Sequence, residues 1–307
     1  MSLSAREVDL FERFRGRLEA IAYRMLGSAS DAEDAVQDTF LRWQAADRGY
    51  VETPEAWLTK ALTNVCLNQL TSARSRRETY VGPWLPEPLL AGDRMLGPAE
   101  TAEQRESVSI AVLTLMERLS PKERVVYVLR EAFGYSHAEI AGMVELSESN
   151  CQQVYHRARQ HVATGRARRE VDAADAEKIA AEFLAAALSG RTEPLIRMLT
   201  GDAAGLTDGG GEVPARSVPM VGAVEIARFL RGGLKPTPAK RAIAGGDYTL
   251  HAAVVNGGPA VVGVLGDRVI GVISLELTAD GISALHIQAN PGKLNRLSRQ
   301  RTTAGER

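Results

Sequence analysis

The stretch from Ser147 to Ala163 carries side chains that could bind nucleic acid on one face of a helix. Amide and guanidinium groups in the N-terminal half of a helix can pair with base edges in a major groove. The outward residues at this spacing are Ser149, Asn150, Gln152, Gln153, His156, Arg157 and Arg159, and the predicted buried face is Cys151, Tyr155, Ala158 and Val162. An ordinary helical hairpin with a solvated polar face is the alternative.

The residues before this helix predict the elements that position it. Ser120–Glu123 and Ser136–Glu139 are two Ser-x-x-Glu capping boxes, in which serine and glutamate satisfy each other's free amides. Pro121 suits the first position of a helix, and Ser147 caps the last one. Together with a turn at residues 145–146, these signals predict a helix-turn-helix.

A second polar stripe lies on an earlier helix, which Thr53 and Pro54 begin. Asn and Thr side chains can hydrogen-bond unpaired bases, and arginines can hold phosphates. The stripe comprises Lys60, Thr63, Asn64, Asn68 and Thr71 and ends in Arg74, Arg76 and Arg77. A solvated face near a frayed helix end would give the same pattern.

A third surface is acidic. A capping box at Ser30–Glu33 predicts a helix to about Ala46, whose polar face carries Asp34, Gln37 and Asp38. This face suits a basic helical partner, although a plain solvated face explains the charges equally well.

Composition limits the classes of protein. The chain has 307 residues, a hydrophobic fraction of 45% and a formal net charge of −1, which indicates several packed domains and a weak grip on DNA by the chain alone. Cys66 and Cys151 occupy core-like positions, and their spacing is not that of a metal site. We therefore expect reduced, buried thiols in a cytoplasmic protein, with no metal and no cofactor. The apolar runs are too short to span a membrane. Five arginines lie between Ser147 and Arg169.

Patterning along the chain predicts four parts. Residues 1–80 read as all helix, 81–104 as a Pro/Gly-rich linker, and 105–168 as the helix-turn-helix domain, led by a helix over Ala99–Leu119. Residues 172–307 read as α+β, with helices at Ala173–Ser189, Glu193–Leu199 and Gly222–Leu230. Their predicted antiparallel strands are Tyr248–Val255, Pro259–Leu265, Arg268–Leu277 and Gly281–Ile287.

Three motifs in this order resemble the extracytoplasmic-function sigma factors of bacterial RNA polymerase. They are Asp31-Ala-Glu-Asp-Ala-Val-Gln-Asp-Thr-Phe40, Ala56-Trp57-Leu58 with Asn64, and Ser147-Glu148 leading to Arg157-Ala-Arg159. The resemblance implies that residues 1–80 bind the polymerase clamp and open the −10 element, and that the helix-turn-helix reads the −35 element. It also implies roles for particular residues. Asp34, Gln37 and Asp38 match the helix that binds the β′ clamp, and the loop 47–53 with Lys60, Asn64, Asn68, Thr71 and Arg74 matches the −10 reader. The expected partners are promoter DNA and the polymerase core, through the β′ clamp helices and the β flap.

Further motifs resemble a subgroup, including sigma-J-type factors, that carries a cone-shaped C-terminal SnoaL-like domain of the NTF2-like fold. They are Trp84-Leu-Pro86-Glu-Pro, Asp208-Gly209-Gly210-Gly211 and Asn290-Pro291-Gly-Lys293-Leu294. The resemblance implies that residues 172–307 regulate the sigma domains in cis. We expect docking on those domains through the Asp208–Gly211 loop and a basic tail with Lys293, Arg296, Arg299 and Arg301.

Two other classes of function stay open at this point. The chain could be a ligand-sensing helix-turn-helix regulator that acts without polymerase core, but such a protein has no need of the acidic helix 31–43. It could also be a SnoaL-like cyclase or isomerase fused to a DNA-binding module, with Asp208, His251 and His286 as candidates. No second carboxylate or triad pattern supports these three residues, so we expect no catalytic residue. A small molecule could still bind in the C-terminal domain.

Overall fold

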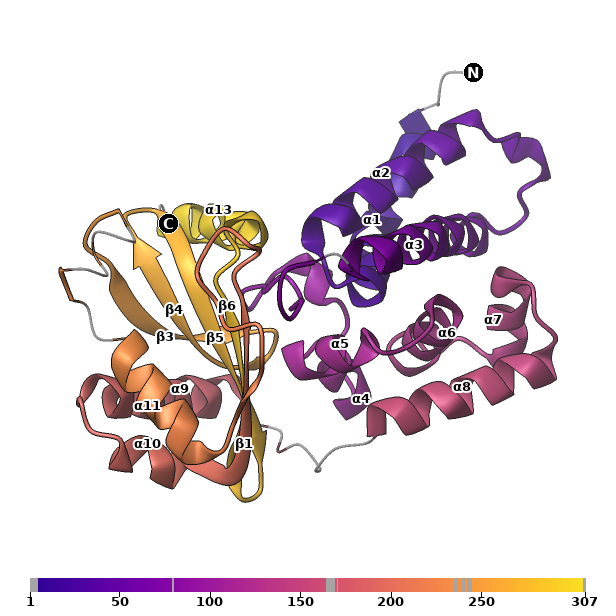
Figure 1. Cartoon of the computed structure of the whole chain (residues 1–307). Helices are drawn as coiled ribbons and strands as arrows, with labels where there is room; N and C mark the ends of the chain where they lie inside the picture. The colour runs from indigo at the N-terminus through magenta and orange to yellow at the C-terminus, as the bar shows by residue number, and fades with distance from the viewer. Residues whose placement is uncertain are drawn as a thin grey trace. The chain divides into compact units, whose positions relative to one another are not determined.

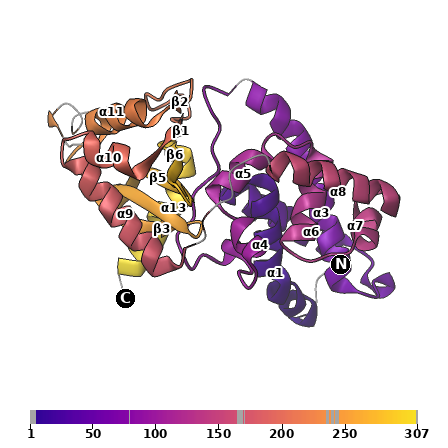
Figure 2. The ribbon, with the colours of Figure 1, turned by 90° about the horizontal axis from the view of Figure 1, so that it is seen from below.

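The computed structural model describes residues 5–78, 80–163, 169, 171–234, 237–238, 241 and 245–305. The chain divides into two compact units, shown in Figures 1 and 2. The first contains residues 1–79, 92–108 and 112–165, and the second contains residues 80–91, 109–111 and 166–307. No helix of the described residues is long and apolar enough to cross a membrane.

Three long helices begin the first unit: α1 (Ala5–Leu26), α2 (Ala29–Ala45) and α3 (Pro54–Glu78). They bury Phe11, Ile21, Val36, Leu58 and Leu62, and a 3-10 turn, η1 (Arg48–Tyr50), lies between α2 and α3. The predicted cap of α2 is wrong by two residues. The Oγ atom of Ser28, not Ser30, accepts from the Asp31 amide at 3.2 Å.

The helix-turn-helix follows as α6 (Pro121–Glu131), α7 (His137–Val144) and α8 (Glu148–Ala163). Both predicted capping boxes are confirmed, and the Asn150 amide donates to Ser147 Oγ at 3.3 Å. Glu145 turns the chain between α7 and α8 in the left-handed conformation.

The predicted helix over Ala99–Leu119 is instead two short helices, α4 (Ala102–Glu106) and α5 (Ile110–Met116), after the turn η2 (Arg94–Leu96). The buried Arg24 guanidinium explains the break. It donates to Ser107 Oγ at 2.9 Å and to the Gln104 carbonyl at 3.3 Å. In a continuous helix, that carbonyl would instead accept a hydrogen bond from a backbone amide of the next turn.

The second unit contains a six-stranded sheet of order β2-β1-β6-β5-β4-β3. The strands are β1 (Leu199–Asp208), β2 (Met220–Val221), β3 (Thr249–Val255), β4 (Gly258–Leu265), β5 (Arg268–Thr278) and β6 (Gly281–Gln288). Strands β3 to β6 form the predicted antiparallel run, and β1 pairs with β6 in parallel. The predicted α+β architecture is therefore confirmed.

Helices cover both faces of this sheet (Figure 1). On one face α9 (Ala173–Leu188), α10 (Glu193–Met198) and α11 (Ala223–Gly233) bury Phe183, Leu195 and Ile226 against the strands. On the other face the C-terminal helix α13 (Asn295–Gly305) buries Leu297, which packs with Leu294 on Val262, Val264, Val269 and Val272. The beginning of α13 is thus part of the core of this unit.

The segment Tyr80–Ala91 belongs to the second unit, although it was predicted to lie in a linker. It extends the sheet at the edge strand β3. The Asn256 amide donates to the Leu89 carbonyl at 2.9 Å, the Ala91 amide donates to the Val254 carbonyl at 3.2 Å, and Leu90 bridges to Val255. Leu85 to Leu89 are all buried.

Candidate nucleic-acid and polymerase interfaces

Helix α8 presents its polar face to solvent. The six residues predicted to read the −35 element are all exposed, namely Ser149, Asn150, Gln152, Gln153, His156 and Arg157. One buried position was predicted wrongly. Val154 lies in the core, whereas Tyr155 is half-buried and donates its hydroxyl hydrogen to Glu131. Both residues fit a spacing of three and four from Cys151, so periodicity could not choose between them.

An ion pair joins α8 to the start of α6. The Arg157 guanidinium lies 4.0 Å from Glu123, whose carboxylate accepts from the Ser120 amide at 2.9 Å. Burial alone would raise the pKa of Glu123, but the hydrogen bonds from Ser120 and the nearby Arg157 charge hold this pKa below its usual value. Arg157 stays 62% exposed, so its guanidinium is available to a ligand.

The polar stripe of α3 is only partly as predicted. Lys60, Asn68 and Thr71 are exposed and Asn64 is half-buried, but Thr63 is fully buried. Thr71 donates its hydroxyl hydrogen to the Leu67 carbonyl at 2.8 Å. The side chains of Arg74, Arg76 and Arg77 lie outside the described residues, as do Arg166 and Arg168.

Tyr50 is a candidate that the sequence analysis missed. It lies in the turn η1, within the loop 47–53, and its side chain is 87% exposed. Its aromatic type within a loop assigned to −10 recognition was the available signal, because an exposed ring can stack on an unpaired base.

The acidic surface of α2 is exposed as predicted at Asp34, Gln37 and Asp38. Leu41 follows on the same face at helical spacing and is 52% exposed. A solvated face has no need of an exposed leucine beside its charges, whereas a protein-binding face commonly combines the two. Leu41 is therefore a second residue that the sequence analysis missed.

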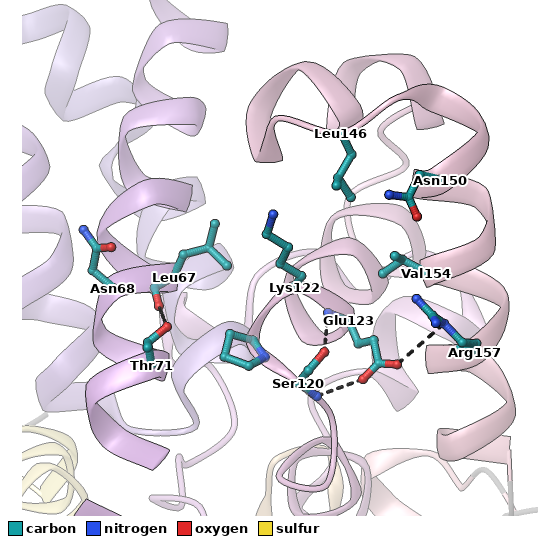
Figure 3. Close-up of a pocket in the computed structure, with 11 residues that line it drawn as sticks. Leu67, Asn68, Thr71, Ser120, Lys122, Glu123, Leu146, Asn150, Val154 and Arg157 are labelled. Carbon is teal, nitrogen blue, oxygen red and sulfur yellow. Dashed lines mark hydrogen bonds and ion pairs between the residues drawn. The ribbon is translucent and has the colours of Figure 1, made fainter. Parts of the chain in front are cut away.

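Residues of α3 and α8 line one cavity of about 730 Å³ in the first unit (Figure 3). Asn68 and Thr71 come from α3, Asn150 and Arg157 come from α8, and Lys122 at the start of α6 lies between them. Two groups of candidate DNA-binding side chains, about 80 residues apart in the sequence, thus face the same space.

In the second unit, Asp208 is the centre of a buried cluster that holds residues 80–91. The Tyr80 hydroxyl and the Leu85 amide donate to its carboxylate at 2.6 and 2.9 Å. Lys293 Nζ lies 2.7 Å from the same carboxylate and also donates to the Leu85 carbonyl at 2.7 Å. Burial and the adjacent Asp208 charge raise the pKa of Tyr80 above its usual range. We call this cluster the linker clamp. It comprises Tyr80, Trp84, Leu85, Pro86, Asp208, Gln288, Asn290 and Lys293.

Of the residues that make the remaining clamp contacts, Trp84, Asn290 and Lys293 belong to predicted motifs, whereas Gln288 and Tyr80 were not predicted. Gln288 donates to the carbonyls of Leu85 and Pro86, each at 3.3 Å, and Asn290 donates to the Tyr80 hydroxyl at 2.8 Å. The Lys293 ammonium lies 4.0 Å from the centroid of the Trp84 ring. Two charges in this cluster are thus neutralised within the second unit.

The glycines after Asp208 allow close approach. Gly210 has a φ of +65°, and a Cβ atom there would lie 2.4 Å from Cγ of Asn290. A Cβ atom on Gly209 would lie 2.1 Å from the Val213 carbonyl oxygen. Pro291 begins the turn η3 (Pro291–Lys293), and Leu294 is buried beneath α13. The glycines therefore allow this loop to pack closely against Asn290. Docking of the loop on the sigma domains stays a prediction.

The candidates for catalysis do not form a site. Asp208 is fully buried in the linker clamp, His286 is 6% exposed within β6, and His251 is exposed on β3. None of the three lines the cavity of about 570 Å³ in this unit.

Comparison with known proteins defines the class. Residues 10–76 match Sigma-70 region 2, and residues 109–162 match Sigma-70, region 4. The chain is 34% identical over 227 residues to the ECF RNA polymerase sigma factor SigJ of Mycobacterium tuberculosis, covering 74% of this chain and 72% of the relative. It is 31% identical over 291 residues to the probable ECF factor SigI of that organism, covering 92% and 93%. The crystal structure of SigJ superposes with a TM-score of 0.71 at 28% identity, covering 94% of this chain and 98% of that one.

The chain therefore belongs to the extracytoplasmic-function sigma factors of RNA polymerase. It directs transcription by binding RNA polymerase core and promoter DNA, and it catalyses no reaction of its own. This excludes the two alternatives of a stand-alone regulator and a fused enzyme.

Proposed function

We propose that α2 binds the β′ clamp helices through Asp34, Gln37 and Asp38, and that the helix-turn-helix docks on the β flap. The −10 element is read by Tyr50 and by the α3 residues Lys60, Asn64, Asn68, Thr71 and Arg74. The −35 element is read by the exposed face of α8, Ser149 to Arg157. The exposure of the described side chains other than the half-buried Asn64 supports the assignments, and the Arg74 side chain lies outside the described residues. Action on RNA polymerase also implies the cytoplasm, the location that we propose.

The compact first unit is, in this proposal, a resting arrangement that opens on polymerase. The two promoter elements are named for positions about 25 base pairs apart, which corresponds to about 85 Å of duplex. Asn68 and Asn150 line a single cavity of about 730 Å³, so these two readers cannot contact both elements from the same arrangement. This observation carries the proposal.

A reversible crosslink across the cavity tests it. Leu67 and Leu146 line the cavity from α3 and from the turn before α8 and are not assigned to DNA, so each can be replaced by cysteine. Cys66 and Cys151 are buried, and burial raises the pKa of the Cys66 thiol to about 12, which keeps it unreactive. A cleavable dimaleimide should abolish promoter-dependent transcription by the double variant, and cleavage should restore it. Full activity of the crosslinked chain would exclude the opening step.

We further propose that the C-terminal domain regulates this opening by holding residues 80–91. These twelve residues connect the two DNA-binding parts of the first unit, and an extended chain of that length spans about 40 Å. While the linker clamp holds residues 80–91, these residues cannot extend, and the −10-reading and −35-reading helices cannot move apart by that distance. Release of the clamp shifts the population toward the open arrangement.

A further inference from the structure

The second unit contains a cavity of about 570 Å³ on the face of the sheet that carries α11. This volume lies in the usual range for small-molecule sites, about 300–1,000 Å³. Its walls are mainly aliphatic, with side chains from the end of α11 and from the four strands β3 to β6: Leu234, Leu250, Val261, Ile273 and Ile287.

Two glycines form part of the cavity wall. Gly263 of β4 and Gly271 of β5 are direct partners across the sheet, in line with Val261 and Ile273, which also pair. Neither glycine has a positive φ, so the backbone does not require glycine there. Glycine in a strand interior weakens the strand and often marks a place where a ligand approaches closely. A Cβ atom on Gly263 would lie 3.3 Å from Cδ2 of Leu250, so the space at this pair is beside Gly271, where the nearest atom would be 3.6 Å away.

The residues with polar side chains at this cavity are Glu212, Tyr248, Arg268, Gln288 and Asn295, and the two charged ones, Glu212 and Arg268, are exposed to solvent. Tyr248, directly before β3, lines the cavity and is half-buried. Burial raises the pKa of its hydroxyl, which stays neutral at physiological pH. Glu212 and Arg268 carry opposite charges, so together they give the lining no formal net charge. A neutral hydroxyl beside mainly aliphatic walls then suits an uncharged ligand with a hydrogen-bonding group.

The cavity shares its wall with the linker clamp. Gln288, Pro291 and Leu294 line the cavity. Gln288 also donates to the Leu85 and Pro86 carbonyls. Pro291 and Leu294 lie within two residues of Lys293, which donates to the Leu85 carbonyl. A molecule in the cavity therefore contacts the elements that hold residues 80–91.

We propose that this cavity binds a small, uncharged, mainly apolar molecule, and that its occupancy tightens the linker clamp. The second half of the proposal rests on the proposed regulatory function, whereas the first half does not. Because the ligand contacts a wall that must stay in place for the clamp to hold, binding stabilises the clamped state over the released one.

N-phenylnaphthylamine, an uncharged fluorophore whose emission rises in apolar sites, is the probe for the test. The full chain should bind it saturably. Gly271→Val should weaken binding at least tenfold by filling the cavity, since a Cβ atom there meets its nearest neighbour, the Gln288 carbonyl oxygen, at an ordinary 3.6 Å. Valine also favours strands, so the melting temperature should not fall. Gly201→Val is the matched control, a strand glycine with open space around it and outside the cavity. Leu250→Phe is a second filling variant if Gly271→Val does not fold.

Hydrogen exchange of the peptide covering residues 80–91 tests the coupling, because the Leu85, Leu89 and Ala91 amides all donate within the second unit. At ten times its Kd the probe should slow this exchange by up to about tenfold in the original chain, and not in Gly271→Val. No saturable binding, or equal binding by a folded Gly271→Val, overturns the site. Saturable binding with unchanged exchange overturns the coupling. Neither result affects the proposed regulation, which variants of Asp208 test without any ligand.

Discussion

The ammonium group of Lys293 lies 2.7 Å from the carboxylate of Asp208, and Asp208 has no exposed surface. Removing one partner of such a pair leaves the other charge buried without compensation, which typically costs about 3–5 kcal/mol. This pair connects the two C-terminal motifs to each other and, through the Leu85 amide and carbonyl, to the linker.

Asp208→Asn should therefore loosen residues 80–91 and raise transcription from a cognate promoter. Faster hydrogen exchange of this segment would be measured beside transcription with purified core polymerase. Asp280→Asn, in the exposed turn after β5, is the matched control and should behave like the original chain. A variant with freely exchanging linker amides but unchanged transcription would show that the clamp does not regulate.

Asp34→Lys combined with Asp38→Lys should abolish binding to RNA polymerase core while leaving the fold intact, since both positions are exposed. Each reversal replaces attraction with like-charge repulsion, which costs several kcal/mol at an interface. Binding to core would be measured by co-purification. Glu177→Lys combined with Glu182→Lys, on the exposed side of α9, makes the same charge change elsewhere. Unimpaired binding by the first variant would disprove the role of α2.

Arg157→Ala and Gln153→Ala should reduce promoter activity through the −35 element. A bidentate contact to a base edge contributes roughly 1–3 kcal/mol of discrimination, about tenfold or more. Both side chains are exposed, so stability should change little. Transcription would be compared across single −35 substitutions, with Gln160→Ala as the control on the same helix. If the variants, the control and the original chain all responded identically to the −35 substitutions, α8 would not be the helix that reads the −35 element.

Tyr50→Ala should weaken opening of the −10 element, whereas Tyr50→Phe should largely retain it. Stacking of one base on an aromatic ring is worth about 1–3 kcal/mol, and phenylalanine keeps the ring. Permanganate reactivity of unpaired thymines in the polymerase complex measures the opening. If the alanine and phenylalanine variants open the promoter equally, the 87% exposed ring has no role in stacking.

A chain ending after Pro291 should lose stability in its C-terminal domain. This truncation removes Leu294 and Leu297, which are 1% and 0% exposed and cover Val262, Val264, Val269 and Val272. Loss of one buried leucine side chain typically costs about 2–5 kcal/mol. A lower melting temperature and increased binding of an apolar dye would be expected. An unchanged melting temperature would show that α13 contributes little to the core.

Much of the fold follows from short-range signals in the sequence. The Ser120 and Ser136 capping boxes fixed the starts of α6 and α7 because their partners lie three residues away. The Asn256-Gly257 pair fixed the hairpin between β3 and β4, since both residues adopt the positive φ that such a turn requires. Polar positions on α2 and α8 were exposed as expected, because amphipathic periodicity separates the two faces of a helix.

The tertiary structure decided what distant residues do to one another. Asp208 meets Tyr80 and Leu85 across more than a hundred residues, and Lys293 reaches Leu85 from still farther along the chain. No local pattern distinguishes a Pro-rich segment that crosses solvent from one that pairs with a sheet edge, so the sequence predicted a linker with the regulatory motif Trp84–Pro88 but not its pairing with β3. Thr63 was predicted on the polar stripe, yet it is buried because other helices pack around α3. Periodicity assigns a residue to a face of its helix, but only packing decides which faces are covered.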